Sequence, residues 1–411
     1  MAPFPLPLNA LFIKAGVYAI FLAIGFGFGY ALEVSGFNDS PRLAAQFYFK
    51  DLRVLKVMFT AIIVAMVLIF ASSALGLLDY NLIWVNPTYL WSGIIGGVIM
   101  GFGFIIGGFC PGTSLVAAAT FKIDGILFVL GGLVGVTIFG ETEKFFEIFY
   151  NGSYFGRVTL MDTFNLPAGV VVVLVVLMAL FMFWGGEQLE RIIGKKDLSK
   201  EPRLRYVGAG AILLAAIAVM LIGQPTTSDR WERLMPVKGA ELTERKYYVH
   251  PGEVLKTFHD HKVEMVLIDV RSEADYNLFH LKDAINILPE EIPAHISEFI
   301  AKPANTIFIV MSNDETAATE VWKVMVAESV HNMYILEGGI NNWLTTFGTA
   351  FEEDFCAGIK EGADDELRFE FTAALGSGCP AAYPDPEEYE LEYIPKIELE
   401  LKRAPSSGGC G

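Results

Sequence analysis

One cysteine of the chain stands where chemistry is favoured. Cys110 lies in the run Phe109-Cys-Pro-Gly-Thr-Ser114, directly after an apolar stretch. Proline suits the first turn of a helix, and the hydroxyls of Thr113 and Ser114 can satisfy backbone N–H groups that a helix start leaves free. Because a helix N-terminus attracts anions, a thiol there could act as a nucleophile or as a soft contact for a sulfur-containing anion. The alternative is that Cys110 is a small packing residue.

The other three cysteines do not form a recognisable motif. Four cysteines are too few and too scattered for a disulfide framework or a four-cysteine zinc site, and we expect no metal and no cofactor. Cys356 and Cys379 could pair in an oxidising compartment. Cys410 is the penultimate residue of the run Ala404-Pro-Ser-Ser-Gly-Gly-Cys-Gly411. A thiol on such an end could carry sulfur, and the alternative is an idle, disordered tail.

The elements that must position these residues fall into two halves of different composition. The chain has 411 residues, is 53% hydrophobic and carries a net charge of −17. Residues 1–223 hold 14 basic and 13 acidic residues, whereas residues 224–411 hold 16 and 34. The acidic second half would repel nucleic acid and anionic lipid headgroups, so we expect no nucleic-acid partner and interpret this charge as a solvated surface.

The first half has the composition of a membrane domain. Crossing about 30 Å of hydrocarbon takes roughly 20 apolar residues of helix. Six stretches qualify, near 10–32, 55–77, 89–109, 123–146, 167–186 and 205–223. They must be helices, because backbone groups in lipid have to pair internally. The sequence therefore predicts a polytopic α-helical domain in a lipid bilayer.

The charges between these stretches predict an orientation. Lys and Arg gather after the first stretch and before the sixth, and residues 78–88 have none. The basic residues of the two loops are Arg42, Lys50, Arg53, Lys56, Arg191, Lys195, Lys196, Lys200, Arg203 and Arg205. By the positive-inside rule both loops face the cytoplasm. In a bacterial inner membrane, this places the second half on the periplasmic face.

The membrane half also contains an internal repeat. Gly25-Phe-Gly-Phe-Gly-Tyr30, followed by Gly36-Phe-Asn-Asp-Ser-Pro41, is echoed by Gly101-Phe-Gly-Phe-Ile-Ile106 and Gly108-Phe-Cys-Pro-Gly-Thr113. Transporter folds often arise from repeats whose broken helices meet at a substrate site. The alternative is that the glycines only allow close helix packing. The candidate substrate-binding residues are Cys110, Pro111, Gly112, Thr113 and Asn38.

These elements resemble the YeeE/YedE sulfur-transport family over about residues 10–150. The resemblance rests on the paired Gly-Phe-Gly-Phe runs, on Phe37-Asn-Asp-Ser-Pro-Arg-Leu-Ala-Ala-Gln46 and on Gly107-Gly-Phe-Cys-Pro-Gly112. It implies uptake of thiosulfate or a related inorganic sulfur anion, passed along by membrane cysteines. Only Cys110 carries over, because Asn38 stands where the first repeat could offer a second cysteine.

The second half alternates between strand and helix patterns. Residues 266–270 and 306–311 read as buried strands, and residues 250–256 and 316–327 as helices, which predicts a parallel α/β sheet. The order of motifs resembles the rhodanese family over about residues 246–348. The motifs are Leu267-Ile-Asp-Val-Arg271, Glu273, Tyr276, Phe279-His-Leu281, Ala284-Ile-Asn286, Leu336-Glu-Gly-Gly-Ile340 and Trp343.

The loop that carries the nucleophile in that family is degenerate in this chain. The resemblance implies a cysteine after the fourth strand that accepts sulfane sulfur as a persulfide, but Ser312 stands there, followed by Asp314 and Glu315. A serine hydroxyl does not hold sulfane sulfur, and the acidic loop would repel thiosulfate. Asp269 and Arg271 are expected to brace the loop and the sheet. We therefore expect no enzyme activity from this loop.

Together these patterns predict four regions. They are a membrane transport domain at 1–223, a linker at 224–245, a rhodanese-like domain at 246–348 and an acidic extension at 349–411. The expected function is transport of thiosulfate or a related inorganic sulfur anion, with the rhodanese-like domain as a binding or regulatory module. The alternatives are a membrane-anchored sulfurtransferase that uses Cys410 and a docking scaffold for a soluble sulfur-carrier protein.

Overall fold

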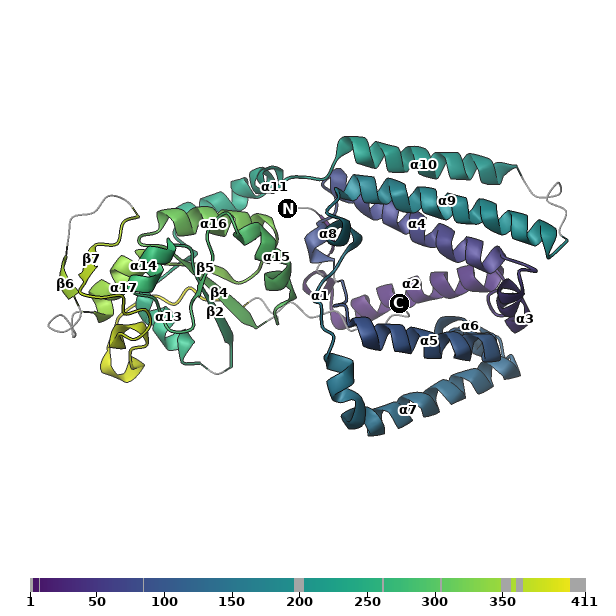
Figure 1. Ribbon diagram of the computed structural model, residues 1–411, viewed down its shortest axis with the longest axis horizontal. Coiled ribbons are helices and arrows are strands. Elements are labelled where there is room, and N and C mark those ends of the chain that lie inside the picture. Colours follow the sequence, from purple (N-terminus) through teal and green to yellow (C-terminus); the bar gives the residue numbers. More distant parts are fainter. Residues whose placement is uncertain are drawn as a thin grey trace. The chain divides into compact units, whose positions relative to one another are not determined.

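The chain divides into two compact units, with the boundary between Gln224 and Pro225 (Figure 1). The computed structural model describes residues 3–6, 8–83, 85–195, 203–260, 262–303, 305–348 and 365–399, and the backbone of 356–359. Each unit is considered by itself below.

The first unit is helical, and its long helices match the predicted membrane stretches. In the described ranges, six helical segments are long and apolar enough to cross a membrane, with α5 and α6 counted as one. The long helices are α2 (Lys14–Val34), α4 (Arg53–Ala74), α5 (Leu90–Gly107), α7 (Ile123–Asn151), α9 (Ala168–Ile192) and α10 (Leu204–Ile222). The shorter ones are α1 (Leu8–Leu11), α3 (Ser40–Ala45), α6 (Pro111–Ala119) and α8 (Leu160–Phe164), with 3-10 turns at Gln46–Tyr48 and Tyr80–Leu82. The prediction of six spans is confirmed.

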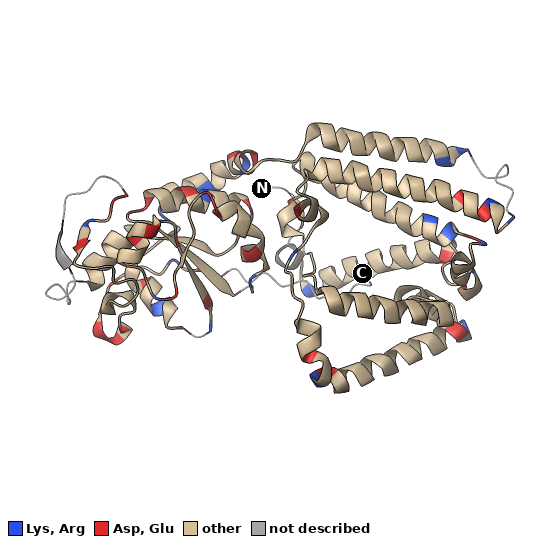
Figure 2. Cartoon of the chain, in the orientation of Figure 1, with Lys and Arg blue, Asp and Glu red and all other residues tan. Residues whose placement is uncertain are grey.

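Charged side chains of this unit gather near the helix ends, and the middle of the helices is free of them among the described residues (Figure 2). Helices α4, α9 and α10 pack through a core that includes Val67, Val172 and Ala216. Glu190 of α9, which is fully buried, ties this helix to the start of α4. Its carboxylate accepts the Leu52 N–H at 2.6 Å and pairs with the Lys56 ammonium at 2.7 Å. A buried carboxylate is thereby satisfied, and the start of α4 is fixed to α9.

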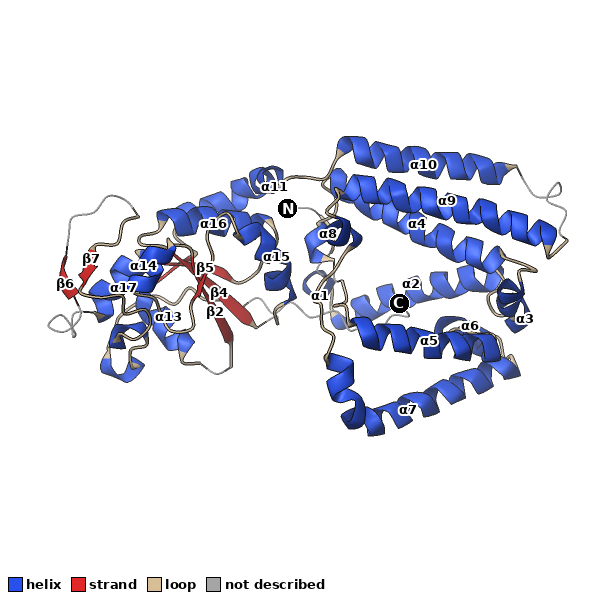
Figure 3. Cartoon of the chain, viewed as in Figure 1, coloured by secondary structure: helices blue, strands red, loops and turns tan. Residues whose placement is uncertain are grey.

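The second unit is built around a five-stranded parallel sheet in the order β1-β5-β4-β2-β3, which confirms the predicted α/β fold (Figure 3). The strands are β1 (Tyr248–Val249), β2 (Glu264–Asp269), β3 (Ile285–Asn286), β4 (Thr306–Met311) and β5 (Met333–Leu336). The helices are α13 (Pro251–Phe258), α14 (Glu273–Leu278), α15 (Ile292–Ala301), α16 (Thr316–Ala327) and α17 (Gly339–Phe347).

Both faces of this sheet are covered. Alternate residues of β4 enter two separate cores, with Ile307 and Ile309 on one side and Phe308 and Val310 on the other. The first core is shared with α13 and α17, and the second with α15 and α16. Strands buried on both faces read as continuous apolar runs, which is why β4 is apolar throughout.

The stretch expected as a linker is helical and packs on this unit. It forms α11 (Thr227–Leu234), a π-helical turn (Met235–Gly239) and α12 (Ala240–Thr243). The guanidinium of Arg230 pairs with Glu328, and the ring of Trp231 lies 6.2 Å from that of Trp322. These residues therefore extend the second core.

The acidic extension is also part of the fold in its described range, 365–399. It contributes Leu367 and Cys379 to the first core, β7 (Phe369–Phe371) pairs antiparallel with β6 (Cys356–Ile359), and 3-10 turns form at Pro380–Ala382 and Pro386–Glu388. Cys379 is a free, buried thiol, and burial raises its pKa. The Cys356 side chain and Cys410 lie outside the described residues.

Residues 389–401 alternate between apolar and polar side chains, which predicts an edge strand or a hairpin that bends at Pro395, but the described part, 389–399, forms no strand. The buried Glu253 carboxylate accepts the N–H groups of Lys396 and Ile397, at 2.9 Å and 2.8 Å. Tyr389, Leu391, Ile397 and Leu399 pack on the first core. The alternation therefore reflects one buried side of an extended segment that has no strand partner among the described residues.

Candidate functional site

Cys110 sits at a break between two helices of the membrane half. Helix α5 ends at Gly107, and Gly108 has a positive φ of 71°, a conformation that favours glycine. A β-carbon on Gly108 would lie 2.9 Å from the β-carbon of Ser40, so the chain passes too close there for a larger residue. Cys110 then caps α6, as its sulfur accepts the Thr113 N–H at 3.4 Å and its own N–H donates to the Thr113 hydroxyl at 3.0 Å. The predicted helix start with proline in the first turn is present.

Helix α6 folds back along the start of α7. A β-carbon on Gly125 would meet that of Ala117 at 2.5 Å, which places the end of α6 beside the first turn of α7. Gly107 lies against the ring of Phe128, five residues into α7. At 1.5 Å per residue, the break is therefore roughly 7 Å beyond the start of α7 along its axis. Cys110 thus stands at the N-terminus of a short helix that starts part-way along a membrane-spanning helix.

The break at Cys110 leaves one backbone N–H donor unused. Nothing lies within 4 Å of where a β-carbon of Gly112 would project, and Cys110 is only half-buried. The N–H of Gly112 has no acceptor among the described residues, whereas those of Thr113 and Ser114 donate to Cys110. The break therefore offers an unused N–H donor next to a half-buried cysteine.

A second break follows α2 and resembles the first in its local geometry. Gly36 has a φ of 77°, Phe37 after it is buried, and the short helix α3 then starts with proline in its first turn. Phe37 and Phe109 belong to one apolar cluster, so the two breaks lie together. The Asn38 amide donates one hydrogen bond to the Glu33 carboxylate, at 2.7 Å. The internal repeat itself stays a prediction.

In the second unit, Ser312 at the nucleophile position is fully buried. Its hydroxyl accepts the N–H of Ala318 in α16 at 3.3 Å. The Asp314 carboxylate accepts the N–H of Thr316 at 2.6 Å. Both side chains therefore satisfy N–H groups that the first turn of α16 leaves free.

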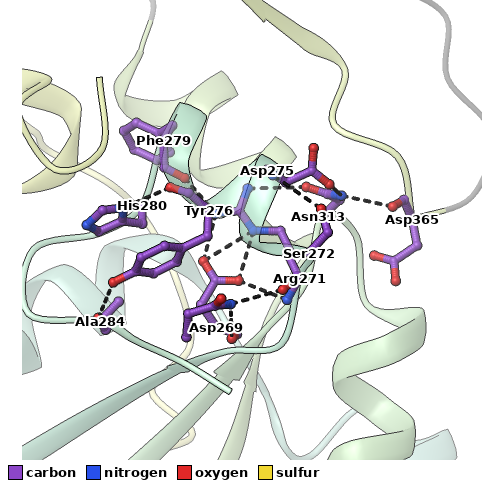
Figure 4. A network of polar contacts seen from close by, with 11 residues as sticks. Asp269, Arg271, Ser272, Asp275, Tyr276, Phe279, His280, Ala284, Asn313 and Asp365 are labelled. Carbon is purple, nitrogen blue, oxygen red and sulfur yellow. Dashed lines mark hydrogen bonds and ion pairs between the residues drawn. The ribbon is translucent and has the colours of Figure 1, made fainter. Parts of the chain in front are cut away.

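Asp269 and Arg271 form a buried brace beneath this loop (Figure 4). The Arg271 guanidinium donates to Asp269 at 2.7 Å, to the Phe279 carbonyl at 2.6 Å and to Asn313 at 3.3 Å. The guanidinium thus holds the end of β2, the turn after α14 and the loop in one place. This geometry is that of a structural pair, since each group is paired and hidden from solvent.

His280 and Glu315 also have structural partners. The ring of His280 stacks on Tyr276 at 3.8 Å, and Nδ1 lies 2.8 Å from the Tyr276 carbonyl. Glu315 accepts from the Gly338 N–H at 2.7 Å and pairs with Arg245 at 2.6 Å. The hydrogen bond that Arg245 donates to Glu315 raises the pKa of Arg245 above the usual value. The expected repulsion by Glu315 is therefore offset by a cation.

The loop has one more partner that sequence reasoning did not find. Asp365 of the extension accepts the N–H of Asp314 at 3.1 Å and that of Ala317 at 3.3 Å, and Asn313 donates to its carbonyl at 2.9 Å. Burial and the nearby Asp314 carboxylate raise the pKa of Asp365, although the Asp314 N–H opposes this. Burial also works to raise the pKa of Asp314, but hydrogen bonds from Thr316 and Asp365 outweigh it and lower this pKa.

Comparison with known families assigns both units. The family model for sulphur transport matches residues 42–250, about half of the chain. The chain belongs to the sulphur transport family. The model for the rhodanese-like domain matches residues 250–346. The resemblances predicted from the sequence are confirmed, and six membrane-competent helices in a member of this family make it an integral membrane protein.

Two curated relatives of this sulphur transport family member are described as probable transporters named YedE. That of Escherichia coli is 27% identical over 166 residues, 39% of each chain, and that of Salmonella typhimurium is 29% identical over 173 residues, 41% of each chain. The chain therefore matches about two fifths of the length of these relatives. The uncharacterized protein YibN of Escherichia coli is 22% identical over 140 residues, 34% of this chain and 90% of that protein. No solved structure matches.

The structure brings together most of the candidate site residues predicted for this family member. The structure joins Cys110, Pro111, Gly112 and Thr113 in one helix start and places the Asn38 break against it. No group of three His, Cys, Asp or Glu side chains that could hold a metal occurs in the described parts of the chain. The signal for the Cys110 break was in the sequence, whereas Asp365 had no motif that could reveal its contact.

Proposed function

We propose that the membrane half moves an inorganic sulfur anion, with thiosulfate as the first candidate, across the bilayer. The observation that carries this proposal is the half-buried Cys110 beside the unused Gly112 N–H, in a member of the sulphur transport family. An anion that leaves water needs hydrogen-bond donors in exchange. Here the donors are the Gly112 N–H and the thiol, and the start of α6 adds partial positive charge.

The rhodanese-like half acts in this proposal as a binding or regulatory module. Ser312 is fully buried and serves as a cap for α16, so this loop has no accessible nucleophile. A serine hydroxyl lacks the nucleophilicity and the sulfur chemistry of a thiolate. Sulfur transfer by this loop is not part of the proposal.

We place the protein in the bacterial inner membrane with the rhodanese-like half in the periplasm. Arg42 and Arg53 follow α2, and Arg191 and Arg205 flank the connection from α9 to α10. The positive-inside rule puts these residues in the cytoplasm. A protease added to intact spheroplasts should therefore cleave off the second unit. Its full protection until the membrane is permeabilised would reverse the orientation.

The test of transport is uptake of labelled thiosulfate into proteoliposomes that contain the full chain. Uptake above that of protein-free liposomes is expected, and unlabelled sulfite, sulfide and sulfate added as competitors rank the specificity. Absence of uptake of all four anions would overturn the proposal. A persulfide on Cys410 after thiosulfate treatment, without uptake, would support the sulfurtransferase alternative instead.

A further inference from the structure

The N-terminus of α16 presents a row of backbone N–H groups that must find acceptors. An α-helix leaves its first N–H groups without partners inside the helix. Ser312 accepts the N–H of Ala318 and Asp314 accepts that of Thr316, both from within the loop. The N–H groups of Ala317 and Asp314 both donate to the carboxylate of Asp365. The loop therefore completes its hydrogen bonds only with a residue about 50 positions further along the chain.

Asp365 is fixed there by its neighbours in the extension. Its own N–H donates to the Asp314 carboxylate at 3.0 Å, and the Asn341 amide donates to the Glu366 carbonyl at 2.9 Å. Two residues later, the buried Leu367 enters the first core. Asp365 also has a positive φ of 61°, a conformation in which aspartate is one of the more tolerant residues. The carboxylate is thus held against the loop from several directions.

The arrangement has the chemistry of an occupied anion site. Two N–H groups and the start of a 12-residue helix converge on one carboxylate. Carboxylates and sulfur oxyanions accept the same hydrogen bonds and are both favoured by the helix dipole. A second anion could not bind beside Asp365 without repulsion from this carboxylate and from Asp314.

We propose that Asp365 is a built-in occupant of an anion-binding cradle, formed by the N–H groups of Asp314 and Ala317, and that it closes the rhodanese-like loop to sulfur oxyanions. The inference holds whether or not the membrane half transports. A hollow of about 500 Å³ lies beside the loop and is lined by Asp314, Thr316, Asn341 and Arg368, among others. An anion could reach the cradle through this hollow once the carboxylate is removed.

The test is hydrogen exchange of the loop in the full chain, purified in detergent. The variant Asp365→Ala removes the carboxylate and leaves the N–H groups in place. We expect peptides covering residues 312–318 to exchange roughly fivefold faster or more, because Asp314 and Ala317 each lose a hydrogen bond worth about 1 kcal/mol. Millimolar thiosulfate should slow this exchange again in the variant and leave the parent unchanged. Sulfate in a parallel sample shows whether the cradle takes sulfur oxyanions in general.

The matched control is Asp385→Ala, which removes another carboxylate of the extension, one that caps only its own turn at Glu387. The loop should exchange in this control as it does in the parent. Unchanged exchange in Asp365→Ala, or equal protection of parent and variant by thiosulfate, would overturn the proposal. If exchange in Asp365→Ala is fast and neither thiosulfate nor sulfate slows it, these N–H groups do not bind sulfur oxyanions and the proposal is wrong. If peptides of β2 and β4 show that Asp365→Ala is unfolded, Asp365→Asn, which keeps one acceptor and loses the charge, is tested against the same outcomes.

Discussion

Replacing Cys110 by serine is expected to reduce thiosulfate uptake several-fold, because the hydroxyl still donates a hydrogen bond to the anion but lacks the polarisable sulfur that would contact the sulfur of thiosulfate. The structure shows the Cys110 sulfur capping α6 through the Thr113 N–H, and the proposal adds a contact with the transported anion. Serine keeps an acceptor for the cap and is a strong N-cap residue, but it lacks the soft sulfur. The comparison therefore separates helix capping from contact with the transported anion.

The same uptake assay includes Cys110→Ala, which removes both roles, and Cys379→Ala, which removes a buried thiol of the second unit. Loss of the cap costs about 1 kcal/mol, so Cys110→Ala should still insert and fold. Cys379→Ala should transport at the parent rate. Parent-like uptake by Cys110→Ser would show that the cap is what matters and that the sulfur contact is wrong.

Much of the membrane half could be predicted, because lipid imposes rules that the sequence must obey. Twenty apolar residues and satisfied backbone groups leave little choice but a helix. The break at Cys110 was also visible, since Gly108 and Pro111 can hardly continue α5 into α6 without interruption. The unused N–H of Gly112 could not be predicted, because it depends on which acceptors the fold brings near.

The rhodanese-like half shows a different limit. Its motifs predicted the sheet and the degenerate loop, because each motif is local. The contact of Asp365 with that loop joins residues about 50 positions apart and lies outside any motif. Residues 389–399 alternate like a strand, but alternation reports only which side is buried and not what the backbone binds. Glu253 supplies acceptors there that a neighbouring strand would otherwise provide.

The two units therefore use helix N-termini in opposite ways. At α6 the cap is supplied by Cys110, and the Gly112 N–H has no acceptor among the described residues. At α16 every N–H of the first turn has an acceptor, and the last one comes from Asp365. An open donor suits an anion that passes, whereas a satisfied helix start suits a stable scaffold. This difference agrees with the transport that we propose for the first unit.

The largest effect on stability is expected from Asp269→Ala in the second unit. The substitution would leave the Arg271 guanidinium buried without its carboxylate partner, and breaking such a pair costs about 3–5 kcal/mol. The loop should loosen as well, because the same guanidinium holds Asn313 and the Phe279 carbonyl. Pulse proteolysis of the full chain across a urea series measures the fraction of the second unit that is unfolded.

Two further variants decide whether the loss comes from the unpaired charge. In Asp269→Leu/Arg271→Met both charges are absent, so the cost should be smaller than in Asp269→Ala. Glu320→Ala breaks an exposed pair with Lys323 and should change stability by about 0–1 kcal/mol. If Asp269→Ala unfolds at the same urea concentration as Glu320→Ala, the pair is not the brace of this loop. If the double variant is as unstable as the single one, the loss comes from packing and not from a stranded guanidinium.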